Sequence, residues 1–231
     1  MSWPETAGLL AVGTAAGLDL VSGPQVLLAR PIVVGTLSGL VLGDLAAGIL
    51  VGGAMELFAL EVLPVGAIKY PDHGPGTVGA VWFCHQAGLA GAGYAVLLAL
   101  VCSEIGGGSL QLVRRANGRA LARVSDRLDR GDPAAAAGLQ IGGAVRDLAR
   151  SLALTLFALG AAMVAWRWGV VDQDIAVELW AFVLAAGVAG AVAGAIRMSG
   201  RSWRGAVLAL ALVAGWLAAS VAPALPIWEG R

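Results

Sequence analysis

Four carboxylates lie in the most apolar third of the chain, where charged side chains are few. They stand in the stretch GDLAAGILVGGAMELFALEVLPVGAIKYPDHGPG, residues 43–76, at Asp44, Glu56, Glu61 and Asp72. An ionised carboxylate at bilayer depth costs roughly 3 kcal/mol on insertion scales, so it normally faces a cavity and has a task. Two kinds of chemistry suit such groups: accepting hydrogen bonds from ligand hydroxyls, or binding and releasing protons.

The local sequence gives each carboxylate a structural alternative. Asp44 follows a glycine and could cap the next helix, which leaves both capping and ligand binding open. Glu56 stands inside VGGAMELFAL, where no cap is needed, and this favours a function. Glu61 lies about 140° further around a helix and is expected to reach an interface or a basic partner. Asp72 stands in YPDHGPG, a loop by its Pro and Gly content, and turn formation is its alternative.

Two polar residues upstream extend this set. Gln25 and Arg30, in GPQVLLARP, could hydrogen-bond a hydroxylated ligand, and Arg30 could instead pair with a carboxylate. Together with the carboxylates they supply both the donors and the acceptors that hydroxyl groups require.

Residues for other chemistries are missing. His73 and His85 are the only histidines, the sequence contains no His-x-x-x-His or Cys-x-x-Cys pair, and no serine has a paired base. We therefore predict no catalytic residue, no metal site and no cofactor. His85, beside Gln86 in an apolar run, is expected to be a core histidine with its hydrogen bonds satisfied.

The composition places the chain in a membrane. Hydrophobic residues make up 58% of the 231 residues and charged residues 13%, with a mean hydropathy of +0.82. These values lie outside the usual range of soluble domains and predict an all-α integral membrane protein with several transmembrane helices. The formal net charge is zero, so nothing indicates a basic surface for nucleic acid.

Runs of about 20 apolar residues mark the predicted transmembrane helices. The first third is different, because residues 6–22 form a short run and residues 31–62 form a run too long for one helix. Gly43-Asp44 and Gly52-Gly53 interrupt the longer run, which predicts broken or re-entrant helices of the kind that line transporter cavities. The glycines of this run also have the spacing for close helix packing. The clear spans are predicted at 77–102, 151–171, 177–196 and 205–223.

One polar segment, Arg114 to Arg150, separates these spans and holds eight of the 15 Lys and Arg residues. Positive-inside counting places it in the cytoplasm. Apolar side chains recur at helical spacing from Val113 to Leu128, with arginines on a neighbouring face, which predicts an amphipathic helix. A solvated linker helix, a helix on anionic lipid and a helix docked on a partner all remain open.

The ordered motifs of residues 18–72 resemble a known family. The stretch LDLVSGPQVLLARPIVVGTLSGLVLGDLAAGILVGGAMELFALEVLPVGAIKYPD has a Gln five residues before Arg-Pro, then Gly-Thr-Leu-x-Gly-x-x-x-Gly-Asp, Gly-x-x-x-Gly-Gly-x-x-Glu, Val-Gly-Ala and Pro-Asp. This order is similar to the N-terminal signature of the membrane IIC component in the mannose/fructose/sorbose family of bacterial phosphotransferase systems (PTS). The rest of the chain is similar in hydropathy and in having a polar segment.

The resemblance implies a multi-pass sugar permease subunit of the bacterial inner membrane that binds and translocates a hexose-type sugar. Its implied partners in an oligomeric complex are a IID membrane subunit and the cytoplasmic proteins IIA and IIB. The soluble proteins would carry the phosphoryl group, so the chain would have no catalytic residue of its own. Gln25, Glu56 and Asp72 match the motif and are the predicted sugar-binding residues, with Arg30 and Asp44 as supporting candidates.

Three positions depart from the family pattern and leave the identity of the sugar open: Glu61, Lys69 and Tyr70. We expect Lys69 to neutralise Glu61 or Asp72, and contact with an anionic substrate is the alternative. The predicted organisation is a single membrane permease domain, residues 1–231. It comprises a glycine-rich sugar-path half (1–102), a basic cytoplasmic helical segment (103–150) and C-terminal helices (151–231).

Two other functions fit the same residues. Glu56 and Asp72 could be the titrating groups of a proton- or cation-coupled carrier of small solutes. A degenerate PTS subunit with a regulatory role is the second alternative.

Overall fold

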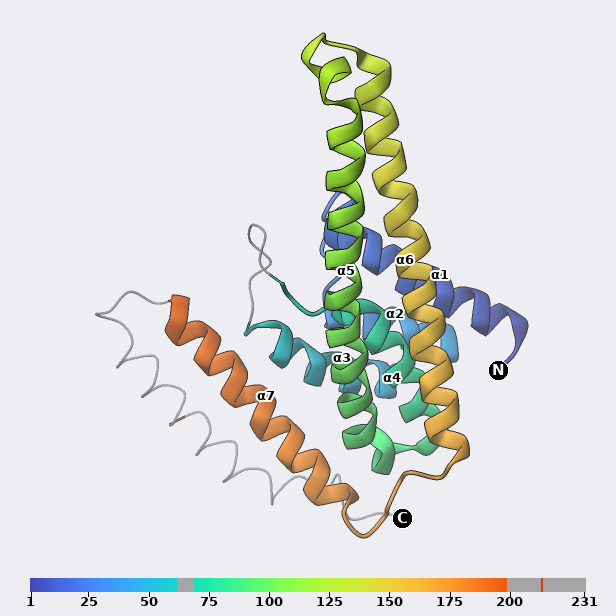
Figure 1. Ribbon diagram of the computed structural model, residues 1–231. Coiled ribbons are helices and arrows are strands. Elements are labelled where there is room, and N and C mark those ends of the chain that lie inside the picture. Colours follow the sequence, from blue (N-terminus) through green and yellow to red (C-terminus); the bar gives the residue numbers. More distant parts are fainter. Residues whose placement is uncertain (62–68, 199–212, 214–231) are drawn as a thin grey trace.

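The fold is all-α, as predicted (Figure 1). The computed structural model describes residues 1–61, 69–198 and 213, and these residues contain helices and no strand. The predicted span at 205–223 lies outside the described residues, apart from position 213. The helices are α1 (Trp3–Val21), α2 (Pro31–Leu42), α3 (Leu45–Ala59), α4 (His73–Ala87), the 3-10 turn η1 (Leu89–Gly91), α5 (Ala92–Asp129), α6 (Pro133–Arg167) and α7 (Ala176–Met198).

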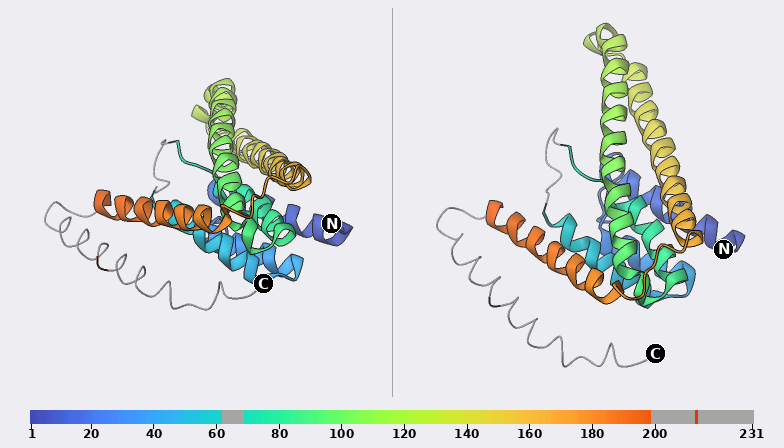
Figure 2. Two further views of the ribbon diagram at one scale, coloured as in Figure 1. Left: turned by 90° about the horizontal axis from the view of Figure 1, so that it is seen from below. Right: turned by 60° about the horizontal axis from the view of Figure 1, so that its bottom comes forward.

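Among the described residues, three segments are long and apolar enough to cross a membrane: Leu89–Asp129, Pro133–Arg167 and Ala176–Arg197. The predicted span at 177–196 agrees with α7 to within two residues. The predicted span at 151–171 falls on the second half of α6, which begins much earlier, at Pro133, and ends at Arg167. In Figures 1 and 2, α5 and α6 run antiparallel and project as a hairpin beyond the shorter helices. α7 lies on the other side of the molecule from α6 and contacts α3 and α5. α5 has 38 residues, roughly 57 Å, so it is far longer than a hydrocarbon core of about 30 Å.

The prediction of one continuous span at 77–102 is wrong. α4 ends at Ala87, the chain turns at Gly88, and α5 begins at Ala92 and packs beside α4. Gly88 has φ +70° and ψ −168°, a backbone conformation that is essentially restricted to glycine. Hydropathy missed the break because the residues around it are small and apolar, so the apolar run continues through the turn.

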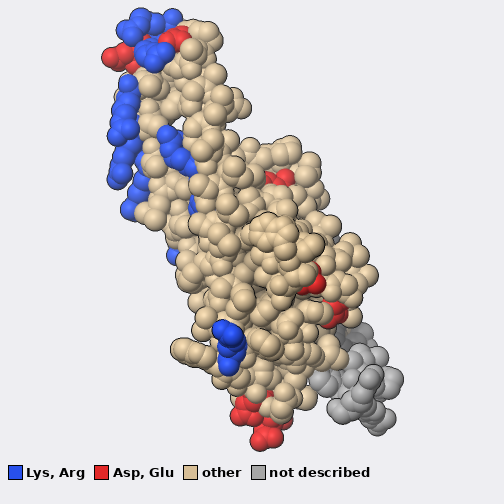
Figure 3. Space-filling view, turned by 90° about the vertical axis from the view of Figure 1, so that its right-hand side faces the viewer, with Lys and Arg blue, Asp and Glu red and all other residues tan. Residues whose placement is uncertain are grey.

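The polar segment of the sequence has no helix boundary at either of its predicted ends. α5 continues from the apolar part through Asp129, and α6 continues from Pro133 into the next span. The predicted amphipathic helix is confirmed, since Arg115, Arg119 and Arg123 are exposed whereas Val113 and Val124 are partly buried. Figure 3 shows Lys and Arg side chains along one side of the projecting hairpin.

The hairpin turns at Asp132, which caps α6. Its carboxylate accepts hydrogen bonds from the backbone N–H groups of Ala134 and Ala135 at 2.9 and 3.3 Å, and from Arg127 Nε at 2.9 Å. The Arg127 hydrogen bond, followed by the backbone ones, lowers the pKa of the Asp132 carboxyl below its usual value.

α2 and α3 form the predicted re-entrant pair. They have 12 and 15 residues, roughly 18 and 23 Å, and each is too short to cross a hydrocarbon core of about 30 Å. Gly43 ends α2 with φ +69°, and the Asp44 side chain accepts from Ala47 N at 3.0 Å, so the predicted cap of α3 is confirmed. Pro31 and Ala59 therefore return to the same end of the pair.

Glycines allow α2 and α3 to pack backbone against backbone. A Cβ built on Gly35 would stand 2.6 Å from Gly52 Cα, and one on Gly48 would stand 2.8 Å from Gly39 Cα. Real Cβ atoms do not approach that closely, so these four positions need glycine. Gly53, on the neighbouring face, has only Ile32 Cδ1 within reach, at 3.8 Å. The predicted packing role thus applies to four of the glycines in this run.

Replacing Gly48 by alanine is expected to destabilise the protein, because the new methyl group meets the α2 backbone and the helices must separate. Overpacking of this kind typically costs about 1–3 kcal/mol. The measurement is the thermal unfolding midpoint of the purified protein, with Gly53→Ala as the matched control. A Gly48→Ala protein as stable as Gly53→Ala would contradict the close approach of these helices.

Candidate functional site

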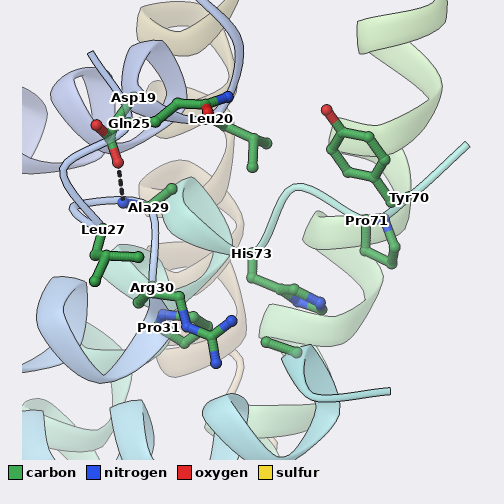
Figure 4. Close-up of a pocket in the computed structure, with 11 residues that line it drawn as sticks. Asp19, Leu20, Gln25, Leu27, Ala29, Arg30, Pro31, Tyr70, Pro71 and His73 are labelled. Carbon is green, nitrogen blue, oxygen red and sulfur yellow. Dashed lines mark hydrogen bonds between the residues drawn. The ribbon is translucent and has the colours of Figure 1, made fainter. Parts of the chain in front are cut away.

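A cavity of about 300 Å³ opens where the re-entrant pair meets the end of α1 and the start of α4 (Figure 4). This volume is at the low end of the range for small-molecule sites. The wall combines polar side chains with apolar surface, as sites that orient a small polar ligand do. Its lining residues are Asp19, Leu20, Gln25, Leu27, Ala29, Arg30, Pro31, Ala59, Tyr70, Pro71 and His73.

One wall of the cavity is the loop between α1 and α2, which Asp19 holds in place. Asp19 is 4% exposed, and its two carboxylate oxygens accept from Val26 N at 2.7 Å and Ala29 N at 3.0 Å. Gln25 and Leu27 have φ of +54° and +68°, a left-handed conformation that costs non-glycine residues about 1–3 kcal/mol. The two hydrogen bonds to a charged carboxylate oppose that cost and keep both residues on the cavity wall.

The second wall is the start of α2, where Arg30 meets Glu56. Arg30 Nη2 donates to Glu56 Oε1, and Ile32 N donates to Glu56 Oε2 at 3.2 Å. Glu56 therefore caps α2 from the last turn of α3, where a negative charge also suits the positive end of the α2 dipole. The pair is partly buried, with the two side chains 33% and 19% exposed. It closes the open end of the re-entrant pair and fixes the guanidinium in the cavity wall.

The third wall is the start of α4, which a buried charge cluster holds. Arg150 of α6 donates from Nη1 to Asp72 Oδ2 at 2.6 Å, and from Nε to Asp147 Oδ1 at 2.8 Å. It also donates from Nη2 to the Gly17 carbonyl of α1 at 3.4 Å. Asp72 N donates to the Ser103 carbonyl of α5 at 3.0 Å. The cluster thus connects α1, α4, α5 and α6 directly behind His73, which lines the cavity.

The cluster holds two carboxylates for one guanidinium. Asp72, Asp147 and Arg150 are 1%, 0% and 8% exposed, and Asp147 Oδ2 has no hydrogen-bond partner among the described residues. A buried ion pair is strongly disfavoured when one partner is removed, because the other charge is left uncompensated. Arg150 is therefore the member that the other two depend on.

Arg150→Leu is expected to destabilise the protein by about 3–5 kcal/mol, because it leaves two buried carboxylates without a cation. Asp147→Asn should cost little, since an amide oxygen can still accept from Arg150 and the Asp72–Arg150 pair stays balanced. Thermal unfolding of the two purified variants measures this difference. Equal midpoints for Arg150→Leu and the unchanged protein would contradict the assigned role.

The structure places the predicted sugar-binding residues at different depths. Gln25 is exposed at the rim of the cavity and Arg30 lies in its wall. Glu56 lies behind Arg30 as its ion-pair partner, which is the pairing that the sequence left open for Arg30. Asp72 is buried behind His73 and is not part of the lining.

Asp44 lies at the far end of α3, about 18 Å along the helix from the Glu56 turn. Its Oδ2 pairs with His85 Nδ1 at 2.9 Å, so the expected hydrogen bond of His85 is present, although both side chains are 32% exposed rather than in the core. Glu61 has the basic partner expected for it, Arg197 at 3.0 Å.

Lys69 does not neutralise Glu61 or Asp72, contrary to our expectation. Its Nζ lies 3.5 Å from Glu104 Oε2, and both side chains are exposed. The reason is that Arg197 and Arg150 already occupy the two predicted partners.

Sequence reasoning missed four residues of this region: Asp19, His73, Asp147 and Arg150. Asp19 is also a carboxylate in an apolar helix, just before a Gly-Pro loop, so the argument used for Glu56 applied to it. Asp147 and Arg150 share the helical phase of the buried Leu154 and Ala158, which could have shown that they face inward. No comparable signal marked His73, because its place in the wall depends on how the chain folds back.

These walls define a class of protein: a multi-helix membrane protein with a polar cavity between broken helices. A family model described as the PTS system sorbose-specific IIC component matches residues 7–180. The chain therefore belongs to this family of membrane-embedded PTS permease components.

Curated relatives match over shorter stretches. The chain is 40% identical over 74 residues to the putative N-acetylgalactosamine permease IIC component 2 of Escherichia coli (strain K12), which covers 32% of this chain and 55% of that protein. It is 49% identical to the sorbose-specific EIIC component of Klebsiella pneumoniae and 56% identical to the fructose permease IIC component of Bacillus subtilis (strain 168), each over 43 residues. Those two matches cover 19% of this chain and 16% of each relative. The matched part spans about half the length of the first relative.

Two solved structures share the fold. One, described as a membrane protein, aligns with a TM-score of 0.64 at 19% identity over 100% of both chains. The other belongs to the cryoEM structure of the mannose transporter ManYZ and microcin E492 (MceA) complex. It aligns with a TM-score of 0.60 at 20% identity, over 100% of this chain and 99% of that one.

Proposed function

We propose that this chain is the membrane IIC subunit of a PTS sugar permease, which binds a hexose-type sugar in the cavity and moves it across the membrane for phosphorylation by cytoplasmic proteins. The observation that carries the proposal is the convergence of the family motif on one cavity. The Gln and Arg-Pro elements of the motif supply Gln25, Arg30 and Pro31 of its wall. The Glu and Pro-Asp elements supply the groups that hold the other walls.

The contacts support separate roles for the motif residues. Gln25 and Arg30 contact the ligand in this proposal, because both line the cavity. Gln25 has an amide that can donate and accept, and Arg30 has further N–H donors besides the one that it gives to Glu56. Glu56 holds the Arg30 guanidinium in the cavity wall, so only the Arg30 side chain separates Glu56 from the ligand. Asp72 acts from behind the wall by fixing the start of α4 through Arg150. Asp44 contributes to the fold of the re-entrant pair rather than to the site.

The ion pairs argue against a proton- or cation-coupled carrier built on Glu56 and Asp72. A relay carboxylate must change its charge during transport, whereas both groups are paired with an arginine and accept further hydrogen bonds or lie fully buried. Protonating Glu56 would leave Arg30 without a counter-charge, and Asp72, which shares Arg150 with Asp147, lies outside the cavity lining.

The proposal includes the partners that a PTS permease requires: a IID membrane subunit, and IIB and IIA phosphocarrier proteins in the cytoplasm. The exposed arginines of the projecting hairpin support a cytoplasmic position for its tip, since basic residues concentrate on that side of membrane proteins. The chain works in this proposal as part of an oligomeric complex in the bacterial inner membrane.

Glu56→Gln is expected to lower sugar affinity about tenfold, because it removes the charge that orients Arg30 and weakens the hydrogen bonds at the open end of α2. Binding of D-mannose, D-fructose, L-sorbose and N-acetyl-D-galactosamine to the purified protein, with any subunit that co-purifies, measures it.

Asp44→Asn is the matched control, since Asn caps helices about as well as Asp and the residue lies at the opposite end of α3. The thermal unfolding midpoint of each variant is measured first, and the affinities are compared only if the two midpoints agree. Unchanged affinity in Glu56→Gln would return this carboxylate to a purely structural role.

A further inference from the structure

We propose that α6 packs in parallel against α6 of a second copy of this chain, along a stripe of exposed apolar side chains. The stripe consists of Ile141, Val145, Leu148 and Leu152. This contact goes beyond the proposed function and does not depend on it, because it follows from the surface of one helix rather than from the cavity.

The side chains of the stripe share one face of α6. Their spacing of four, three and four residues places them within roughly 60° of arc, at about 100° per residue. Ile141, Val145, Leu148 and Leu152 are 64%, 57%, 44% and 40% exposed. In Figures 1 and 2, only α5 among the described helices lies beside the projecting part of α6. Apolar residues at this heptad spacing are the pattern by which two helices interlock in a coiled coil.

The stripe extends beyond the part of α6 that lipid can cover. α6 ends at Arg167, between Trp166 and Trp168, and tryptophan favours the membrane interface. Counting back about 20 residues, the length of a hydrocarbon core, reaches Leu148. Ile141 lies roughly 10 Å further along the helix, outside the core. Lipid tails therefore do not cover this end of the stripe, and a run of exposed apolar side chains outside the bilayer favours a protein partner.

The arginines of the hairpin mark the same boundary. Arg146 Nη1 of α6 donates to Asn117 Oδ1 of α5 at 2.8 Å, so these two residues lie at one height. Arg115, two residues before Asn117, is the first exposed arginine of α5. Basic side chains thus begin where the hydrocarbon core ends by the count along α6.

The stripe carries no charge, which suits contact with an identical surface. Between residues 133 and 152, the charged residues of α6 are Arg146, Asp147 and Arg150. Asp147 and Arg150 are buried in the cluster behind the cavity, and Arg146 turns toward α5. A second copy therefore brings no like charge against the stripe, and a charged partner would find no opposite charge on it.

The membrane restricts how two copies can meet. Copies of one chain insert with the same orientation, so a symmetry axis between them runs along the membrane normal. The two α6 helices then run parallel, and each residue of the stripe faces its own counterpart. Small exposed residues flank the stripe and allow close approach of the helices. These are Ala137, Gly138, Ala144 and Ala149.

The test is oxidative disulfide cross-linking in membranes from cells that make the full-length protein. A disulfide forms only between Cα atoms within about 7 Å, so one cysteine per chain at the contact links two copies. Val145→Cys probes the stripe. Arg119→Cys is the matched control, because Arg119 is an exposed residue of the arginine face of the same hairpin. The native Cys84 and Cys102 are buried, so the unchanged protein should stay monomeric on a denaturing gel.

We expect Val145→Cys to form a disulfide-linked dimer and Arg119→Cys to stay monomeric. Val145→Glu places two carboxylates against each other across the contact, so native mass spectrometry of the purified protein should show loss of the species that holds two copies. Arg119→Glu should leave that species unchanged.

Three results would overturn the proposal. Equal amounts of dimer in both cysteine variants would mean random collision, and no dimer in either would mean that the stripe is not a contact. A cross-link of Val145→Cys to a different subunit alone would assign the stripe to that subunit. These readouts do not involve sugar, so failure of the proposed function is a separate result.

Discussion

The contact between Arg150 and Asp72 is the interaction on which the site depends. It joins α6 to the first residue before α4 at 2.6 Å, in surroundings where both side chains are almost fully buried. The same guanidinium also reaches Asp147 and the α1 backbone, so one cation sets the relative positions of three helices. Because the low-polarity surroundings make separation of these charges costly, the start of α4 is a fixed wall for the cavity.

A second arginine and carboxylate solve a different problem at the re-entrant pair. Helices that end inside a membrane leave backbone N–H groups that water cannot reach, and each needs an internal partner. The Glu56 carboxylate accepts the N–H of Ile32, and its ion pair with Arg30 neutralises the charge of that carboxylate. Glycines let the two short helices pack closely enough for this contact to form. The glycines that pack, the Glu56 that caps and the Arg30 that lines the cavity therefore depend on one another.

The sequence predicted the elements whose signal is local. Composition and apolar runs identified the membrane fold, and the Gly43-Asp44 break gave the re-entrant pair with its cap. Features that depend on tertiary contacts could not be predicted from the sequence. The turn at Gly88 lies inside an unbroken apolar run. Arg150 was counted with the polar segment although its side chain faces the interior. Gln25 and Arg30, which the sequence marked as a polar set, both line the cavity, whereas Asp19 and His73 enter the cavity only through the folding of the chain.

Protection of the cavity wall by sugar tests the central claim most directly. Leu27 lines the cavity and Val26 does not, although both are about two-thirds exposed on the same loop. The native Cys84 and Cys102 are buried, which keeps background labelling low. A cysteine at Leu27 should react with a maleimide more slowly when the sugar that the protein binds is saturating, and a cysteine at Val26 should react at the same rate with and without it. Equal rates at Leu27 in both conditions would contradict a sugar site in this cavity.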